Sequence, residues 1–354
     1  MSIRLALPVL AAAGFLSTTA LADVKVVASI KPVHSLVASI MEGAGSPEIL
    51  VDGAASPHTY SLKPSQARSL ADADVVFWVG PSLEPFLEKP LETIAEGSTS
   101  VALDDAPGLA LLDVREGGAF EEHDHDHEGH DDHAEHDHDD HDGHDDHEEH
   151  DDEKHEEAGH EGEGHDHDDH DNEKHAHEDH DGHHSFDPHI WLDPVNASAM
   201  ADAIAASLQM ADPENAALYA ENLATLKTRL NSLIEGVAPV VEPVKQKPFI
   251  VFHDAYHYFE NRFGLSAAGS ITISPEVSPG AARISEIREK VSDLKAVCVF
   301  SEPQFESSLV GAIIEGTDAK TAVLDPLGAE LANGPDLYFS LIGNMADSMA
   351  DCLG

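Results

Sequence analysis

Histidines carry the most informative chemistry in this chain of 354 residues. Of the 26 histidines, 21 lie in residues 121–184, a run that starts EEHDHDHEGHDDH and also holds 31 Asp and Glu residues against two lysines. Imidazoles and carboxylates at this density predict binding of divalent cations. We assign weak, auxiliary metal binding to the first eight histidines of the run: His123, His125, His127, His130, His133, His136, His138 and His141.

Residues 121–184, called the His-rich tract below, contain almost no aliphatic or aromatic side chains. Such a segment cannot bury enough apolar surface to offset the entropy lost on ordering, so the sequence predicts a disordered loop inserted into a folded lobe. A flexible chain must be ordered around each bound ion, which predicts several weak sites rather than one tight site. Its carboxylates also attract cations electrostatically.

The five remaining histidines are His34, His58, His189, His253 and His257. His58 follows a predicted strand, EILVDGAA, and His253 ends another, FIVFH. Ligands of open parallel sheets bind beyond the carboxyl ends of the strands. We therefore expect some of these imidazoles to meet at one site.

Asp325 ends a third predicted strand, KTAVLD, and His189 lies in FDPHIWLDP directly after the His-rich tract. Together with His58 and His253 they form a set of three imidazoles and one carboxylate, which suits tetrahedral zinc. The alternative for each single histidine is a hydrogen-bonded structural residue at a strand end. His257 could be an extra ligand or a packing residue, and His34 could support the site or only pack in its helix.

The elements that would position these residues alternate between strands and helices, which predicts parallel sheets covered by helices. A long amphipathic helix separates two such groups, with apolar residues at steps of three and four that form one buried stripe. The helix could join two lobes stiffly or lie on one of them. The stripe consists of Tyr219, Leu223, Leu226, Leu230, Leu233 and Val237.

The ends of the chain and its composition indicate export. A basic residue, an apolar stretch and the small-x-small site ALA predict a signal peptide over 1–22, the alternative being a retained anchor helix. No later apolar stretch is long enough to span a membrane.

The formal net charge is −49, which argues against a nucleic-acid partner. Cys298 and Cys352, the two cysteines, are expected to pair if the protein is exported, and otherwise to be buried thiols.

Six motifs resemble one family in order along nearly the whole mature chain: ASPHTYSLKPSQ, ADVVFWVGPSLE, DPHIWLDP, VFHDAYHYFE, CVFSEPQF and LDPLG. They look like the zinc-binding solute-binding proteins of ABC transporters, the ZnuA type. The resemblance implies an α/β fold of two (β/α) lobes, with mainly parallel four-stranded sheets, joined by one long rigid helix. It places the metal in the cleft between the lobes. It also implies a periplasmic protein whose partners are the permease and ATPase subunits of an ABC-type zinc importer.

The resemblance also implies roles for single residues. The metal histidines of the family match His58, His189 and His253, and a carboxylate that some members replace by water matches Asp325. The disulfide of the family matches Cys298 and Cys352. Manganese members carry a carboxylate where His253 stands, so imidazole there favours Zn²⁺.

Three further expectations concern the surroundings of the site and the domain layout. Glu302 and Asp254 could accept hydrogen bonds from the rings of metal histidines. We expect a monomer without stable membrane insertion. The expected organisation is a signal peptide over 1–22, an N-terminal lobe over 23–120 and 185–212, the His-rich tract over 121–184, a linking helix over 213–244 and a C-terminal lobe over 245–354.

Two other classes of protein compete with a zinc receptor. An exported zinc enzyme would need an open coordination position and a nearby base, and the chain has no H-E-x-x-H motif. A zinc buffer would depend on the His-rich tract alone. The chain has no phosphate-binding loop, so any ATP hydrolysis would take place on another chain.

Overall fold

The computed structural model describes residues 24–115, 120, 186–272, 279–305 and 308–354. The predicted signal peptide and the His-rich tract lie outside the described residues. All described residues belong to one structural unit of the chain.

The N-terminal lobe is built on a parallel sheet with strand order β2-β1-β3-β4. Val27 of β1 pairs with Glu48 of β2, and Val26 pairs with Val75 of β3. Every residue of β1 is buried, as expected for an inner strand covered on both faces. The strands are β1 (Val26–Ile30), β2 (Glu48–Val51), β3 (Val75–Trp78) and β4 (Thr99–Ala102). The helices of this lobe are α1 (Lys31–Ile40), α2 (Pro64–Ala71), α3 (Pro85–Thr93) and α4 (Pro194–Ala211).

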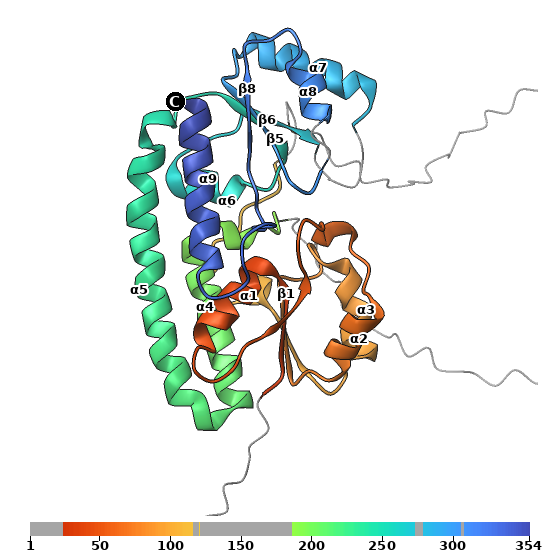
Figure 1. Cartoon of the computed structure of the whole chain (residues 1–354), viewed down its shortest axis with the longest axis vertical. Coiled ribbons are helices and arrows are strands. Elements are labelled where there is room, and N and C mark those ends of the chain that lie inside the picture. The colour runs from red at the N-terminus through yellow and green to blue at the C-terminus, as the bar shows by residue number, and fades with distance from the viewer. Residues whose placement is uncertain (1–23, 116–119, 121–185, 273–278, 306–307) are drawn as a thin grey trace, which may run out of the picture. The chain divides into compact units, whose positions relative to one another are not determined.

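The C-terminal lobe repeats this arrangement with strand order β6-β5-β7-β8, again entirely parallel (Figure 1). Successive residues of β5 face opposite sides of the sheet. Phe249 and Val251 join the large core, whereas Ile250 and Phe252 join a smaller core under α7 and α8. The strands are β5 (Phe249–His253), β6 (Gly269–Thr272), β7 (Cys298–Ser301) and β8 (Lys320–Val323). The helices are α6 (His257–Phe263), α7 (Ala281–Asp293), α8 (Ser308–Ile314) and α9 (Leu337–Leu353). The predicted α/β class with two four-stranded parallel sheets is confirmed.

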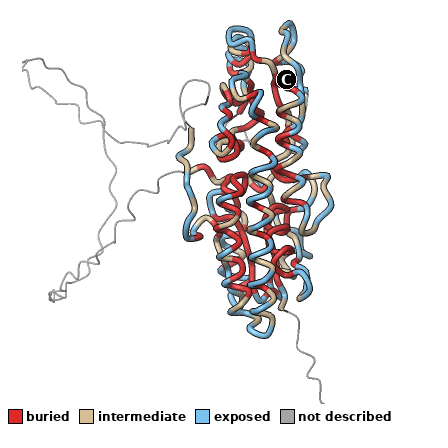
Figure 2. Tube along the Cα trace, turned by 90° about the vertical axis from the view of Figure 1, so that its left-hand side faces the viewer, coloured by how far each residue is buried: buried red, intermediate tan, exposed pale blue. Residues whose placement is uncertain are grey.

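The long helix α5 (Ala216–Val241) packs against helices of both lobes, α1 and α4 of the N-terminal lobe and α9 of the C-terminal lobe. Of its predicted apolar stripe, Tyr219, Leu226, Leu230 and Val237 are buried. Figure 2 faces this helical layer and shows buried and exposed residues alternating along it. The helix therefore braces the two lobes along its length, rather than spanning a gap between them.

The helix α9 also crosses between the lobes, because its first turn is bonded to α1. The Tyr338 amide donates to Ser35 Oγ at 3.0 Å, and the Tyr338 hydroxyl donates to the carbonyl of Trp191 at 2.7 Å. Both bonds are buried, so they fix the C-terminal lobe against the N-terminal lobe close to His189.

Cys298 and Cys352 form a disulfide that joins the start of β7 to the end of α9. The predicted pairing is confirmed. The bridge ties α9 to the sheet of its own lobe, while the rest of that helix packs against α1 and α5.

The sequence patterns do not predict α3 or β6, for physical reasons. Two prolines, Pro85 and Pro90, interrupt the pattern of α3, although the first is a favoured start of a helix. The strand β6 is only four residues long and contains Gly269, so its extended form depends on pairing with β5.

Glu84 is a fully buried carboxyl at the carboxyl end of β3. Its Oε2 accepts a hydrogen bond from the Val79 amide at 2.7 Å and lies 3.4 Å from the Gly80 amide. Gly80, at φ 152°, has no room for a Cβ beside the Asp104 carboxylate. Burial raises the pKa of Glu84 to about 7, with the negative charge of Asp104 adding to the shift.

This raised pKa predicts a dependence of stability on pH. The folded state holds the Glu84 proton more tightly than the unfolded state, so this stabilisation is complete below pH 4.5 and is lost as pH rises through 7. The shift corresponds to about 3 kcal/mol. Between pH 5 and pH 8, wild type should lose about that much more unfolding free energy than Glu84→Gln in urea titrations. Equal losses in the two proteins would contradict the assignment.

Candidate metal centre

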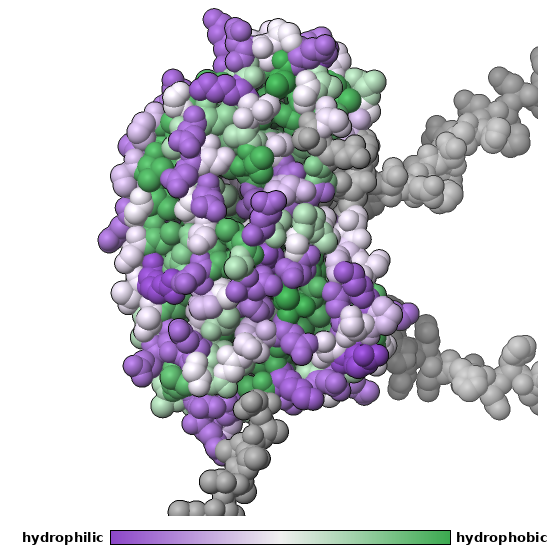
Figure 3. Space-filling view, in the orientation of Figure 1, coloured by the Kyte–Doolittle hydropathy of each residue, from purple (hydrophilic) through white to green (hydrophobic). Residues whose placement is uncertain are grey.

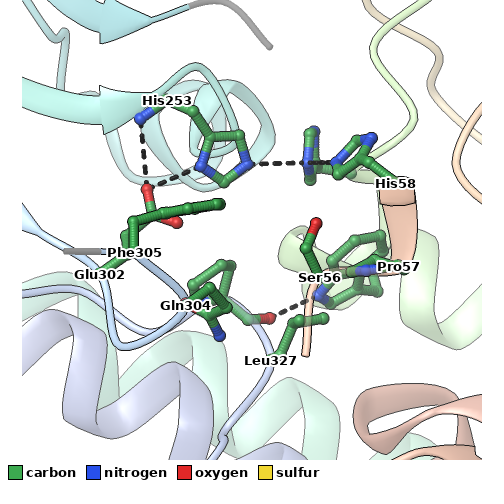
Figure 4. Close-up of a pocket in the computed structure, with 11 residues that line it drawn as sticks. Ser56, Pro57, His58, His253, Glu302, Gln304, Phe305 and Leu327 are labelled. Carbon is green, nitrogen blue, oxygen red and sulfur yellow. Dashed lines mark hydrogen bonds and ion pairs between the residues drawn. The ribbon is translucent and has the colours of Figure 1, made fainter. Parts of the chain in front are cut away.

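Three histidines, His58, His189 and His253, meet where the two lobes face each other. His58 lies in a short 3-10 helix, Pro57–Thr59, after β2, and His253 is the last residue of β5. His189 directly precedes the short 3-10 helix Ile190–Leu192. Figure 4 shows His58 and His253 turned toward one another from different lobes.

The Nε2 atoms of these histidines have the spacing of ligands around one small ion. His189 Nε2 lies 3.4 Å from His58 Nε2 and 3.3 Å from His253 Nε2. All three ligand atoms lie within 4.8 Å of one another. Zn–N bonds of 2.0–2.1 Å in a tetrahedron place neighbouring nitrogens about 3.3–3.4 Å apart. Among the described residues, this is the one group of three or more metal-binding side chains.

Two buried carboxylates orient two of the rings. His189 Nδ1 lies 2.7 Å from Asp187 Oδ1, and His253 Nδ1 lies 2.7 Å from Glu302 Oε1. A ring that donates from Nδ1 presents the lone pair of Nε2 to a metal, and the carboxylate makes the ring a stronger ligand. Glu302 is therefore placed as expected from the sequence. Asp187 is not among the expected residues, although the spacing D-P-H, two residues before His189, is a usable signal.

The surroundings shift the pKa values of these groups in different directions. Burial lowers the pKa of His58 and of His189 well below its usual range, so both rings stay neutral. Burial acts in the same direction on His253, but the Glu302 carboxylate outweighs it and raises the pKa. Burial raises the pKa of Asp187 to about 7, while its hydrogen bond from the His189 amide opposes the shift. A cation bound at Nε2 of the neighbouring ring would favour the charged form of this carboxyl.

Asp325, expected as a fourth ligand, lies outside the group of three histidines in the structure. Its carboxylate accepts hydrogen bonds from the amides of Leu327 at 3.1 Å, Gly328 at 2.9 Å and Ala329 at 2.6 Å. Gln304 Nε2 donates to the same carboxylate at 3.1 Å. Asp325 thus shapes the turn after β8, because its short side chain folds back onto the amides that follow it.

Asp254, expected beside a metal histidine, pairs instead with Arg115. His257 Nδ1 lies 4.0 Å from Asp187 Oδ2, so His257 approaches the carboxylate behind His189 but is not in the group of three. His34 is buried in α1, and its Nε2 bonds to the carbonyl of Pro47 at 3.1 Å. None of these three residues joins the three histidines.

The cavity at the histidines is small and mostly apolar. Its free volume is about 10 Å³, the space of roughly one water molecule. Trp191 donates from Nε1 to the carbonyl of Pro326 at 2.9 Å. This bond joins the part of the cavity lining that comes from the C-terminal lobe to the part that comes from the N-terminal lobe. Besides the three histidines, the lining consists of Ser56, Pro57, Trp191, Glu302, Gln304, Phe305, Pro326 and Leu327. Such a site fits one ion and excludes larger ligands.

Within the described part of the chain, no helix has the length and apolar character needed to cross a membrane. The face shown in Figure 3 mixes hydrophilic and hydrophobic residues.

Comparison with known proteins places this site in a family. The family model described as zinc-uptake complex component A, periplasmic (ZnuA), matches residues 26–352. The chain is 52% identical over 328 residues to a protein of Brucella abortus named high-affinity zinc uptake system protein ZnuA, covering 93% of this chain and 91% of the relative. A protein of Yersinia pestis with the same name is 35% identical and is covered over 92% of its length, with 94% of this chain matched.

Solved structures share the fold. One described as the crystal structure of ZnuA has a TM-score of 0.68 at 22% identity, covering 94% of this chain and all of the other. The solute-binding protein FpvC of Pseudomonas aeruginosa, solved with Mn²⁺, also has a TM-score of 0.68, at 16% identity, with 94% of this chain and 99% of that one covered. Because the family model spans almost the whole chain, from β1 to the end of α9, this protein belongs to the ZnuA family of periplasmic zinc-uptake components.

Proposed function

We propose that this protein captures Zn²⁺ in the periplasm with His58, His189 and His253 and delivers it to the permease and ATPase subunits of an ABC-type importer. The observation that carries the proposal is the spacing of 3.3 and 3.4 Å between the Nε2 atoms, close to an edge of a zinc tetrahedron. Relatives at 52% and 35% identity are named as zinc uptake proteins, and the family is one of transport components rather than enzymes.

The chemistry of the donors favours zinc over manganese. Three imidazoles form the site, and the carboxylates of Asp187 and Glu302 act on the far side of two rings. Zn²⁺ accepts nitrogen ligands readily, whereas Mn²⁺ prefers oxygen. The fold itself does not decide between metals, since the solved structure of FpvC contains Mn²⁺.

The site is held in place before the metal arrives, which lowers the ordering cost of binding. Two of its rings are nearly fully buried and bonded to carboxylates, and the lobes are braced by α5 and α9. From composition alone, we propose that the His-rich tract gathers zinc at weaker sites, including His123 to His141, and raises its concentration near the folded lobes.

A zinc titration separates these roles. With chelator competition, the full chain should bind one tight Zn²⁺ and several weaker ions, and a chain lacking residues 121–184 should keep only the tight one. A hundredfold excess of Mn²⁺ should not displace it. Loss of all tight binding on deletion, with the circular dichroism spectrum unchanged, would instead favour a zinc buffer. Displacement by Mn²⁺ would overturn the metal assignment.

A further inference from the structure

Arg115 forms a partly buried ion-pair cluster with two carboxylates of the C-terminal lobe, Asp254 and Glu260. Its Nε donates to Asp254 Oδ2 at 2.9 Å, and a terminal nitrogen donates to Asp254 Oδ1. The guanidinium also donates to Glu260 Oε2 at 2.7 Å and to Oε1 at 3.0 Å. The three side chains are 16%, 10% and 2% exposed. Arg115 is not one of the described residues that line the metal cavity, so we do not assign it a role as a metal ligand.

One end of the cluster lies directly beside a metal histidine. Asp254 follows His253 in the chain, and Glu260 lies in α6, the helix that starts four residues after His253. Glu260 also accepts a hydrogen bond from the amide of Ala267 at 2.8 Å. Arg115 therefore holds the turn between β5 and α6, the turn in which His253 ends its strand.

Arg115 is also connected through the backbone to Asp187, the carboxylate that holds the His189 ring. Arg115 lies two residues after Asp113, which forms an antiparallel bridge with Phe186. The Asp187 amide donates to the carbonyl of Leu112 at 2.9 Å. The same Asp187 holds the His189 ring at 2.7 Å. A displacement of the Arg115 segment would be passed to Asp187 through these backbone bonds.

A tyrosine of α6 reinforces the same connection. The Tyr258 hydroxyl donates to the carbonyl of Asp187 at 2.8 Å and accepts from the Leu112 amide at 3.1 Å. Two contacts therefore join this paired backbone to α6. Tyr258 bonds to it directly, and Arg115, two residues after Asp113, bonds to Glu260.

We propose that Arg115 is a positioning residue of the metal site that sets the separation between His189 and His253 across the two lobes. The inference rests on the proposed zinc function. The two Nε2 atoms come from residues 64 apart in sequence, and they must stay about 3.3 Å apart to share one tetrahedral ion. Arg115 connects the backbone that supports one ring to the turn that carries the other, and it neutralises two carboxylates that would otherwise repel each other.

Arginine suits this role better than lysine. Its planar guanidinium donates from fixed directions to both carboxylates at once, whereas a lysine ammonium is a compact charge on a flexible stem. Arg115→Lys therefore keeps the charge balance and the fold but loses the fixed geometry. Arg115→Met also removes the charge and leaves two nearly buried carboxylates unpaired, which costs stability.

Arg229 provides a control at a more exposed ion pair, where the arginine side chain is 38% exposed and its partner 82%. It donates to Asp336 at 2.6 Å and lies over the ring of Phe339 at 3.8 Å, much as Arg115 lies over Phe120 at 4.3 Å. Its partners are not adjacent to any of the three histidines in sequence. Arg229→Lys therefore makes the same chemical change away from the site.

The test measures zinc affinity of the full chain by chelator competition at one equivalent of Zn²⁺, and the visible absorption of bound Co²⁺. Arg115→Lys should weaken tight zinc binding roughly 10-fold and reduce the tetrahedral Co²⁺ bands. This is the lower end of the effect of direct hydrogen-bond partners of metal ligands, because Arg115 acts on the histidines through the turn after β5 and through Asp187. Arg229→Lys should stay within twofold of wild type. Arg115→Met should weaken binding at least as much wherever it folds.

The outcomes separate this inference from the proposed function. Tight zinc binding by wild type and by Arg115→Lys alike, with the same Co²⁺ spectrum, would overturn the positioning role. An equal loss in Arg115→Lys and Arg229→Lys would overturn it too, because the effect would then not depend on contact with the supports of the site. Absence of tight zinc binding in wild type would overturn the proposed function instead.

Discussion

Replacing His189 by alanine is expected to weaken tight zinc binding roughly 100- to 1,000-fold. Structural zinc sites with four protein ligands bind with about 10–16 kcal/mol, so one ligand contributes about 2.5–4 kcal/mol. His189 is the central member of the three histidines, because its Nε2 lies 3.4 Å from that of His58 and 3.3 Å from that of His253. Its loss also leaves the buried Asp187 carboxyl without its imidazole partner. Chelator competition at pH 7.5 measures the affinity directly.

A second buried histidine serves as the control for this experiment. His34 lies in α1 outside the group of three, and glutamine can keep its bond to the carbonyl of Pro47. His34→Gln should therefore bind zinc within a few-fold of wild type. A His189→Ala protein that folds and binds zinc within tenfold of wild type would remove His189 from the ligand set.

Removing the disulfide by the double change Cys298→Ala and Cys352→Ala should lower the free energy of unfolding by about 4 kcal/mol. The bridge closes a loop with a sequence separation of 54, and the chain-entropy model gives this value for a loop of that length. Alanine avoids burying two hydroxyl groups where the cysteines are 0% and 5% exposed. Urea titration of both proteins under non-reducing conditions measures the change.

Zinc binding by the folded fraction should be almost unaffected by loss of the disulfide. Cys298 begins β7, whereas Glu302, which supports His253, directly follows the opposite end of that strand. Wild type treated with a reductant should approach the stability of the double variant. Equal urea midpoints for oxidised wild type and the double variant would show that the bridge adds no stability.

Much of the fold could be predicted from the sequence, because its patterns are local. The β-branched runs at Val26–Ile30 and Phe249–His253 form buried inner strands, and the apolar stripe of α5 recurs at helical spacing. The rule that ligands bind at the carboxyl ends of parallel strands predicts a shared site for His58 and His253 from their positions in the sequence. The strand β6 was missed because its extended form depends on its partner β5 rather than on its own residues.

Residues that support the site could not be chosen from adjacency alone. Asp254 stands next to His253 in the chain, yet its carboxylate turns to Arg115, while Glu302 reaches the ring from another strand end. Asp254 lies in the turn after β5, where the chain changes direction, so its side chain leaves the backbone away from the His253 ring. The position of Asp325 at a strand end likewise does not reveal the partners of its carboxylate. In the structure this carboxylate accepts hydrogen bonds from three backbone amides.

The sequence by itself determined the types of the ligands, the strands and helices that carry them and the family to which the chain belongs. The tertiary structure alone decided that three imidazoles from two lobes stand 3.3 and 3.4 Å apart, that Asp187 holds one of them, and that Arg115 links their supports. Residue types and local periodicity follow from neighbouring positions in the chain. Distances between residues 131 and 64 positions apart are set by how the lobes pack, which no local pattern records.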